Sequence, residues 1–274
     1  MSPDARAPRD ARHAADAPGA GQARAAGVVG GAPPAGTEGG EAALLWLEML
    51  ARLAALGGHA VRNPLNAAAV NLEVVRTRLA RGGGRERGTG GGGALLPFAG
   101  RAAEELERAT ALLNALLDLA RPPQPPLDLE RVARPLVTVY AAMAASGASD
   151  ATEGAGTVTL VSGSTPLLID VPSTVARLAV AGGLDAVCVV GARVECVLEA
   201  DDGTEASGGG DVRGPLARAT IRRVAPDDAV PAQGGVALAK EIVTAARGAG
   251  IEIRDVPGGC VMDFPRVRSR VRGG

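Results

Sequence analysis

Aromatic side chains are almost absent from this sequence, which has one Trp, one Tyr and two Phe among 274 residues. A buried core must therefore be built from Leu, Val and Ala rather than from rings. Net charge is also nearly absent, because 29 Lys and Arg balance 30 Asp and Glu to give −1 at pH 7. This balance gives no reason to expect a nucleic acid or an anionic membrane surface as partner. We attribute the abundance of Ala, Gly and Arg to codon bias.

Cysteine is scarce and apolar runs are short. The three cysteines, Cys188, Cys196 and Cys260, are odd in number and lack metal-type spacing, which favours free buried thiols in a reducing compartment. No stretch approaches the ~20 apolar residues that span a bilayer, and the first residues include no apolar segment of a secretory signal. We therefore expect a cytoplasmic protein without a membrane span or a metal site.

In the first half of the chain, the composition and the periodicity of the sequence change at Glu41. Residues 1–40 are rich in Ala, Gly, Pro, Arg and Asp without periodicity, which predicts a disordered arm. Leucines at helical spacing then predict a helix from Glu41 to Arg81 and a second one over Leu95–Ala120. A Gly-rich run separates the two helices, and the Pro-rich linker 122–127 ends the second. Residues 41–121 are thus expected to form a helical hairpin.

A hairpin of this kind cannot bury its apolar stripe alone. Two hairpins that pair into a four-helix bundle would bury it, so we expect a homodimer. The alternative is a stripe that docks on the second domain of the same chain, but so long a stripe favours bundle packing.

A second domain is expected over residues 128–268, followed by a tail over 269–274. Its apolar patterns alternate between helical and strand periodicity. The predicted helices cover Leu129–Ala145, Ser173–Val187 and Gly235–Ala246, and the predicted strands cover Thr157–Val161, Pro166–Val171, Arg193–Ala200, Ala217–Val224, Ile251–Asp255 and Cys260–Phe264. This order predicts an α+β fold, a helical hairpin followed by a two-layer α/β sandwich.

The segment most informative about chemistry is His-Ala-Val-Arg-Asn-Pro-Leu-Asn, residues 59–66. Pro64 cannot donate a backbone hydrogen bond to Ala60, so the helix should bend just beyond His59 and expose its imidazole. A neutral imidazole is nucleophilic and can accept a phosphoryl group. Asn63, one helical turn later, could orient a water or that group. The alternative is a solvated helix histidine without chemistry.

This segment resembles the H box of sensor histidine kinases, which typically reads His-Glu-x-Arg/Lys-Asn/Thr-Pro-Leu-Asn. The likeness covers about 41–121 and includes Arg108 and the run 112–121 in the second helix. It implies that His59 is the phosphoacceptor and that Arg62 and Asn63 belong to its catalytic site. One position departs, because Ala60 stands where the family has an acidic base. General-base catalysis typically contributes ~10²–10⁴-fold, which this chain would lack.

Residues 128–268 resemble, in degenerate form, the ATP-binding domain of the same kinases. Gly234 and Gly235 echo the Gly-x-Gly-Leu-Gly-Leu motif of that domain and are candidate nucleotide-binding residues. The family's two Asn residues for magnesium and phosphate fall at Ala181 and Asp185. Magnesium prefers oxygen ligands, so Asp185 could serve but Ala181 could not.

The segment between the predicted strand Ala217–Val224 and the predicted helix Gly235–Ala246 also departs from the kinases. Asp227 and Asp228 lie where the adenine-reading motif belongs, but without its glycines. Residues 225–234 are too few for a lid that closes over a triphosphate. ATP and Mg²⁺ are therefore expected as cofactors only if kinase activity survives.

Three functions remain open. In the first, His59 exchanges a phosphoryl group with the receiver domain of a response regulator, or receives it from a partner histidine kinase. In the second, the chain is a divergent ATP-dependent kinase that phosphorylates its own His59. In the third, it is a dimeric scaffold that binds regulators without chemistry. Asn63 also leaves room for a phosphatase role toward a regulator.

Overall fold

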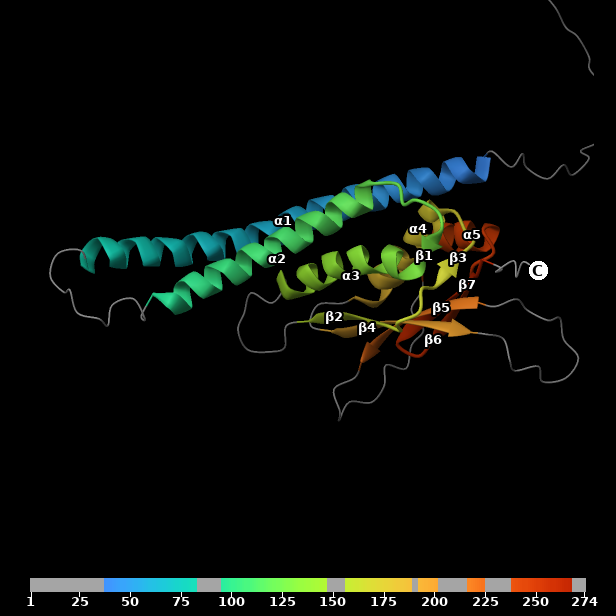
Figure 1. Cartoon of the computed structure of the whole chain (residues 1–274). Helices are drawn as coiled ribbons and strands as arrows, with labels where there is room; N and C mark the ends of the chain where they lie inside the picture. The colour runs from blue at the N-terminus through green and yellow to red at the C-terminus, as the bar shows by residue number, and fades with distance from the viewer. Residues whose placement is uncertain are drawn as a thin grey trace, which may run out of the picture. The chain divides into compact units, whose positions relative to one another are not determined.

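The computed structural model describes residues 37–82, 95–146, 156–188, 192–201, 216–224 and 238–267. Five helices and seven strands are assigned within these residues (Figure 1). In chain order they are α1 (Thr37–Gly82), α2 (Leu96–Ala120), β1 (Leu127–Asp128), α3 (Leu129–Ser146), β2 (Thr157–Ser162), β3 (Leu168–Ile169), α4 (Ser173–Val187), β4 (Arg193–Asp201), β5 (Leu216–Val224), α5 (Lys240–Gly248), β6 (Glu252–Val256) and β7 (Gly259–Pro265). The predicted class, a helical hairpin followed by a mixed α/β sheet, is confirmed.

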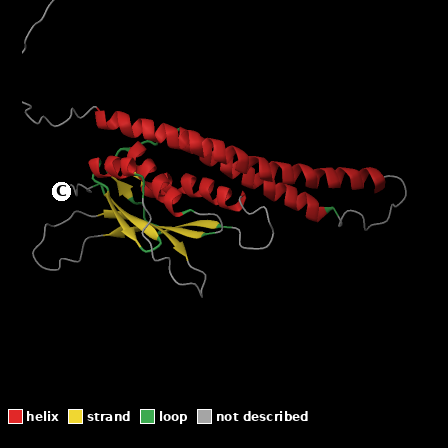
Figure 2. Cartoon of the chain, turned by 180° about the vertical axis from the view of Figure 1, so that it is seen from behind, coloured by secondary structure: helices red, strands yellow, loops and turns green. Residues whose placement is uncertain are grey.

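The hairpin consists of α1 and α2, which pack side by side (Figures 1 and 2). Small and branched residues form the contact. A Cβ atom built on the buried Gly57 would lie 3.1 Å from both Cδ atoms of Leu116, so the two helices approach closely there. Near the tip of the hairpin, the guanidinium of Arg78 lies 4.7 Å from the centroid of the Phe98 ring, a cation–π contact.

The main sheet has five strands in the order β2-β4-β5-β7-β6. β2 and β4 are parallel because the chain returns to the sheet through α4, and the other neighbours are antiparallel. Helices α3, α4 and α5 lie on one side of this sheet (Figure 2). The two faces of the sheet therefore have different environments.

The helix-covered face of the sheet is apolar. Alternate residues such as Cys196, Ile221 and Met262 point into it and are completely buried, as the period of two in a strand requires. Phe264 and Tyr140 are also buried, but most of the core consists of Leu, Val, Ile and Ala, as the composition predicted.

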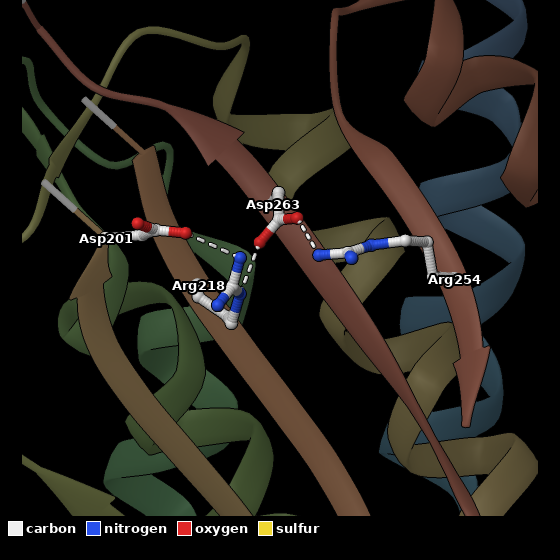
Figure 3. A network of polar contacts seen from close by, with 4 residues as sticks. All are labelled: Asp201, Arg218, Arg254 and Asp263. Carbon is white, nitrogen blue, oxygen red and sulfur yellow. Dashed lines mark hydrogen bonds and ion pairs between the residues drawn. The ribbon is translucent and has the colours of Figure 1, made fainter. Parts of the chain in front are cut away.

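The opposite face of the sheet carries a chain of ion pairs (Figure 3). Arg218 on β5 reaches Asp201 at 2.6 Å and Asp263 on β7 at 2.7 Å, and Arg254 on β6 binds the second oxygen of Asp263. Asp263 is only 2% exposed, so its charge is matched by two guanidiniums where water is excluded. The network therefore ties four neighbouring strands together.

The last hairpin forms as the sequence predicted. Gly258 has φ +71°, a left-handed conformation that favours glycine. A Cβ on Gly259 would lie 2.1 Å from the carbonyl oxygen of Ile221, closer than any side chain can approach. These two glycines therefore set the turn between β6 and β7.

Several predicted boundaries differ from the structure. The strand expected over Pro166–Val171 is reduced to β3, which pairs with β1 outside the main sheet, and β1 itself was not predicted. Helix α5 begins at Lys240 rather than Gly235. Residues 1–36, most of the glycine-rich run between α1 and α2, and residues 268–274 lie outside the described residues. The arm and tail therefore stay predictions.

One expectation about hydropathy is wrong. Over Gly40–Ala80, α1 is long and apolar enough to cross a membrane by length and composition, with hydropathy of 1.3 in its best window, although the sequence was expected to contain no such stretch. A core helix of a soluble protein passes the same test, and 33% of the window is buried inside the structure.

Candidate functional site

His59 lies near the middle of α1 and its side chain is exposed. The next two side chains point toward the packed face of the helix, since Ala60 and Val61 are only 4% and 8% exposed. Gly57, two residues before His59, is buried against α2. The imidazole is thus held on the outer face of a helix whose opposite face is packed. This is the exposure that the sequence predicted.

Arg62 and Asn63 follow His59 within one turn, and both are exposed. In the part of the chain that the structure describes, the side chains of these three residues form no hydrogen bond or ion pair, so their donors and acceptors are available to a partner. Helix α1 continues through the half-buried Pro64 without interruption. The bend expected beyond His59 stays a prediction.

The candidate magnesium ligand Asp185, on α4, is already engaged. Its carboxylate forms an ion pair with Arg52 of α1 and accepts a hydrogen bond from the Tyr140 hydroxyl at 3.5 Å. The same hydroxyl also lies 3.2 Å from the carbonyl oxygen of Ala181, so these two acceptors share its single proton. The structure therefore brings the two predicted positions, 181 and 185, together around the only tyrosine in the sequence.

The electrostatics of this cluster follow from burial and charge. Burial raises the pKa of Tyr140 and the negative charge of Asp185 raises it further, so the phenol stays protonated and donates. Burial alone would lower the pKa of Arg52, but the hydrogen bond and charge of Asp185 outweigh it and the pKa is raised. Arg52 lies two turns before His59, about 10 Å along the helix axis at ~1.5 Å per residue.

A buried arginine joins the hairpin to the α/β half. Arg177 on α4 is 6% exposed and donates hydrogen bonds to the carbonyl oxygens of Leu119 at 3.0 Å and Asp118 at 2.9 Å. These carbonyls end α2, which has no basic residue in its own last turn. A cation there satisfies orphan acceptors and the negative end of the helix dipole. Its guanidinium also lies 5.6 Å from the ring centroid of Trp46 on α1.

The sequence did not single out Arg52, Tyr140 or Arg177. Each acts through a partner on a distant segment, which no local periodicity reveals. The only available signals were that Tyr140 and Trp46 are single residues of their kinds and that Arg177 interrupts an apolar helix.

The other predicted cofactor residues are not placed. Gly234 and Gly235 lie outside the described residues. Across the described ranges, no group of three or more His, Cys, Asp and Glu side chains is arranged to hold a metal ion.

Comparison with known proteins gives structural matches only. No family model and no curated protein sequence matches the chain. A bacterial phosphotransferase of known structure is 15% identical, with a TM-score of 0.34, over 79% of this chain and 95% of that chain. The histidine kinase AdeS of Acinetobacter baumannii is 12% identical, with a TM-score of 0.32, over 76% of this chain and 97% of that chain.

A third match is the blue-light-activated histidine kinase EL346 of Erythrobacter litoralis, which is 17% identical with a TM-score of 0.28. This match covers 72% of the present chain and 58% of EL346. The chain thus has structural matches to histidine kinases over most of its length.

Proposed function

We propose that this chain is a two-component signalling protein in which His59 exchanges a phosphoryl group with the aspartate of a response-regulator receiver domain. The observation that carries the proposal is the position of His59, whose ring is exposed while its neighbours Ala60 and Val61 are buried. A partner domain can reach the ring from solvent, and the packed face behind it fixes its direction.

The transfer needs no cofactor bound to this chain. An imidazole nitrogen attacks the phosphorus of the regulator's aspartyl phosphate, an N–P bond forms, the acyl P–O bond breaks, and the aspartate leaves as carboxylate. The proton of the attacking ring passes to solvent, and the reverse step returns the phosphoryl group. Arg62 would attract the charge of the phosphoryl oxygens and Asn63 would orient them.

We infer that ATP and Mg²⁺ do not drive this chemistry. The carboxylate of Asp185, the one retained oxygen ligand at the two family positions, is paired with Arg52 and Tyr140. Magnesium would have to displace a guanidinium to reach it, and position 181 offers only a backbone carbonyl within hydrogen-bond distance of the Tyr140 hydroxyl. The residues present fit an internal ion pair better than a metal.

The same proposal includes a homodimer formed by the hairpin. Exposed leucines follow one another at intervals of seven on both helices, which is the spacing of a bundle seam. On α1 they are Leu65, Leu72 and Leu79, and on α2 they are Leu106 and Leu113, all between 42% and 59% exposed. A second copy that packs on this seam would complete four helices and leave His59 accessible. The expected cytoplasmic location also remains part of the proposal.

The test is phosphotransfer from a panel of ³²P-labelled receiver domains to the full chain. We expect label on the protein that is lost in acid and kept in alkali, as for phosphohistidine. His59→Gln should abolish labelling, whereas His13→Gln, the change at the only other histidine, should leave it intact. Label that survives in His59→Gln would contradict the assignment.

A second arm separates the alternatives. Incubation with labelled ATP and Mg²⁺ should give no label, and label dependent on His59 would establish the divergent kinase instead. If no receiver and no foreign kinase labels the chain while a receiver is still retained on the immobilised protein, the scaffold function replaces the proposal.

A further inference from the structure

A groove of about 670 Å³ lies at the end of α2, beside the Pro-rich linker and the first turns of α3. This volume falls in the range of roughly 300–1,000 Å³ that small-molecule sites occupy. His59 does not line it. Three linker prolines, Pro122, Pro123 and Pro126, give one wall a rigid apolar surface. The groove is therefore a separate feature of the molecule.

The walls of the groove hold more positive than negative groups. Four guanidiniums line it, those of Arg121, Arg131, Arg134 and Arg177, against three carboxylates, those of Asp118, Asp128 and Glu130. One positive charge is thus left over (4 − 3 = +1).

Two of the carboxylates are already satisfied within the chain. Glu130 forms an ion pair with Arg134, and the hydrogen bond from that arginine is the main cause of its lowered pKa. Asp128 accepts the backbone N–H groups of Glu130 at 3.1 Å and of Leu167 at 3.4 Å. Neither acid therefore pairs directly with Arg121 or Arg131, although the charge of Asp128 still counts in the balance of the groove.

Donors, in contrast, are left over. Within the described residues the exposed Arg131 forms no ion pair, and Arg121 has only a loose contact of 3.9 Å with Asp118. Arg177 is buried, and its Nε atom is shielded from solvent without any acceptor in the described structure. Burying an unpaired donor on a cation is costly, and a negative charge nearby reduces that cost.

We propose that this groove binds a small organic carboxylate. Arg131 and Arg121 hold the carboxylate, since the planar guanidinium fork matches its two oxygens. The apolar body of the ligand lies along the proline wall. A single carboxylate also matches the single excess charge of the groove, and its field stabilises the buried Arg177 without reaching it. The site is independent of His59 and of phosphoryl transfer.

The proposal is tested with benzoate and its neutral isostere benzamide, added to the full-length protein and followed by ligand-observed NMR. We expect benzoate to bind at least tenfold more tightly than benzamide. Arg131→Gln should weaken benzoate binding at least tenfold, whereas the matched change Arg101→Gln, on the exposed surface of α2 outside the groove, should leave it unchanged. Arg131 is exposed, so this variant is expected to fold.

Each other outcome overturns the proposal. Equal binding of benzoate and benzamide would show that the groove does not distinguish an anionic ligand from a neutral one. Benzoate binding that Arg131→Gln leaves unchanged would place the anion elsewhere on the protein, and the absence of benzoate binding would remove the site. His59→Gln should bind benzoate like the unmodified chain, so failure here and failure of the phosphotransfer assay are distinguishable.

Discussion

At the scale of single residues, the three cysteines make the free energy of unfolding fall as pH becomes alkaline. Burial is the main cause that raises the pKa of Cys188, Cys196 and Cys260 to about 12, from an ordinary value of 9.0. In the unfolded chain each thiol would ionise near its ordinary pKa, while in the folded chain it stays protonated. The stabilising contribution is therefore complete below pH 9 and is lost as pH rises toward 12.

We expect urea unfolding to show a free energy that falls as pH increases from 8 to 10.5. In Cys196→Ala this free energy should fall less steeply with pH, because one of the three thiols with a raised pKa is removed. The pKa of Tyr140 is also raised, and its contribution to the pH dependence is the same in the variant. A slope identical to that of the unmodified protein would show that Cys196 does not titrate differently in the two states. As a second readout, iodoacetamide should alkylate the folded protein at pH 8 at least tenfold more slowly than the unfolded protein.

The candidate site was predictable where the chemistry is local. His59, Arg62 and Asn63 lie within one turn, so a motif and helical geometry were sufficient to predict their positions on one exposed helix face. Asp185 was found by position, but its partners Arg52 and Tyr140 come from other helices, 133 and 45 residues away along the chain (185 − 52 and 185 − 140). Contacts of that separation depend on how elements pack, which periodicity does not encode.

At the scale of elements, the hairpin has two apolar stripes, and only one is buried in the single chain. Leu53, Leu112 and Leu119 belong to the buried stripe, with exposures of 0–2%. The other stripe is the exposed leucine seam proposed above as the dimer contact. An apolar seam at heptad spacing is stable in water only when a partner covers it.

We expect Leu72→Asp to raise the dissociation constant of the dimer at least a hundredfold, because a carboxylate would be buried without a partner. Light scattering should then show a monomer. Val70→Asp is the matched control. Val70 is 64% exposed and lies off the seam, so the same substitution should leave the dimer intact. A monomer in the unmodified protein would exclude the seam as an interface, and equal dissociation in both variants would indicate loss of the helix rather than of the contact.

The boundaries of the elements were predictable to within a few residues where the apolar period is strong. The helix over Ser173–Val187 was predicted at the bounds it has, and Pro172 directly precedes it. β1 and β3 were missed or misplaced because each has only two paired residues, too few to establish a period. Their pairing joins Leu127 to Ile169, which lie far apart along the chain, so no local period reveals it.

At the scale of the whole described chain, the hairpin and the α/β half share one core. Leu53 and Trp46 of α1 belong to the same buried apolar cluster as Leu136 of α3 and Phe264 of β7. Arg177 adds polar bonds across this junction. Helices and sheet that share a continuous core lose their packing together, so cooperative unfolding is expected.

We therefore expect one unfolding transition, with the same midpoint by far-ultraviolet circular dichroism and by the fluorescence of Trp46, the only tryptophan. Arg177→Ala removes the bonds to Leu119 and Asp118 and leaves the end of α2 without its cation. Hydrogen bonds to charged groups contribute roughly 1.5–3 kcal/mol each, and desolvation of the arginine offsets part of this, so a loss of about 2 kcal/mol is expected. Arg101→Ala, on the exposed side of α2, should change stability by less than about 0.5 kcal/mol.

The two probes distinguish a shared core from two independent domains joined at residues 122–127. Trp46 is 8% exposed and reports the junction, whereas circular dichroism is dominated by the long helices. If the fluorescence midpoint precedes the circular dichroism midpoint in the unmodified protein, the α/β half separates before the hairpin melts and the core is not cooperative. If the two midpoints coincide in the unmodified protein and separate only in Arg177→Ala, the guanidinium of Arg177 is the group that couples the hairpin to the α/β half.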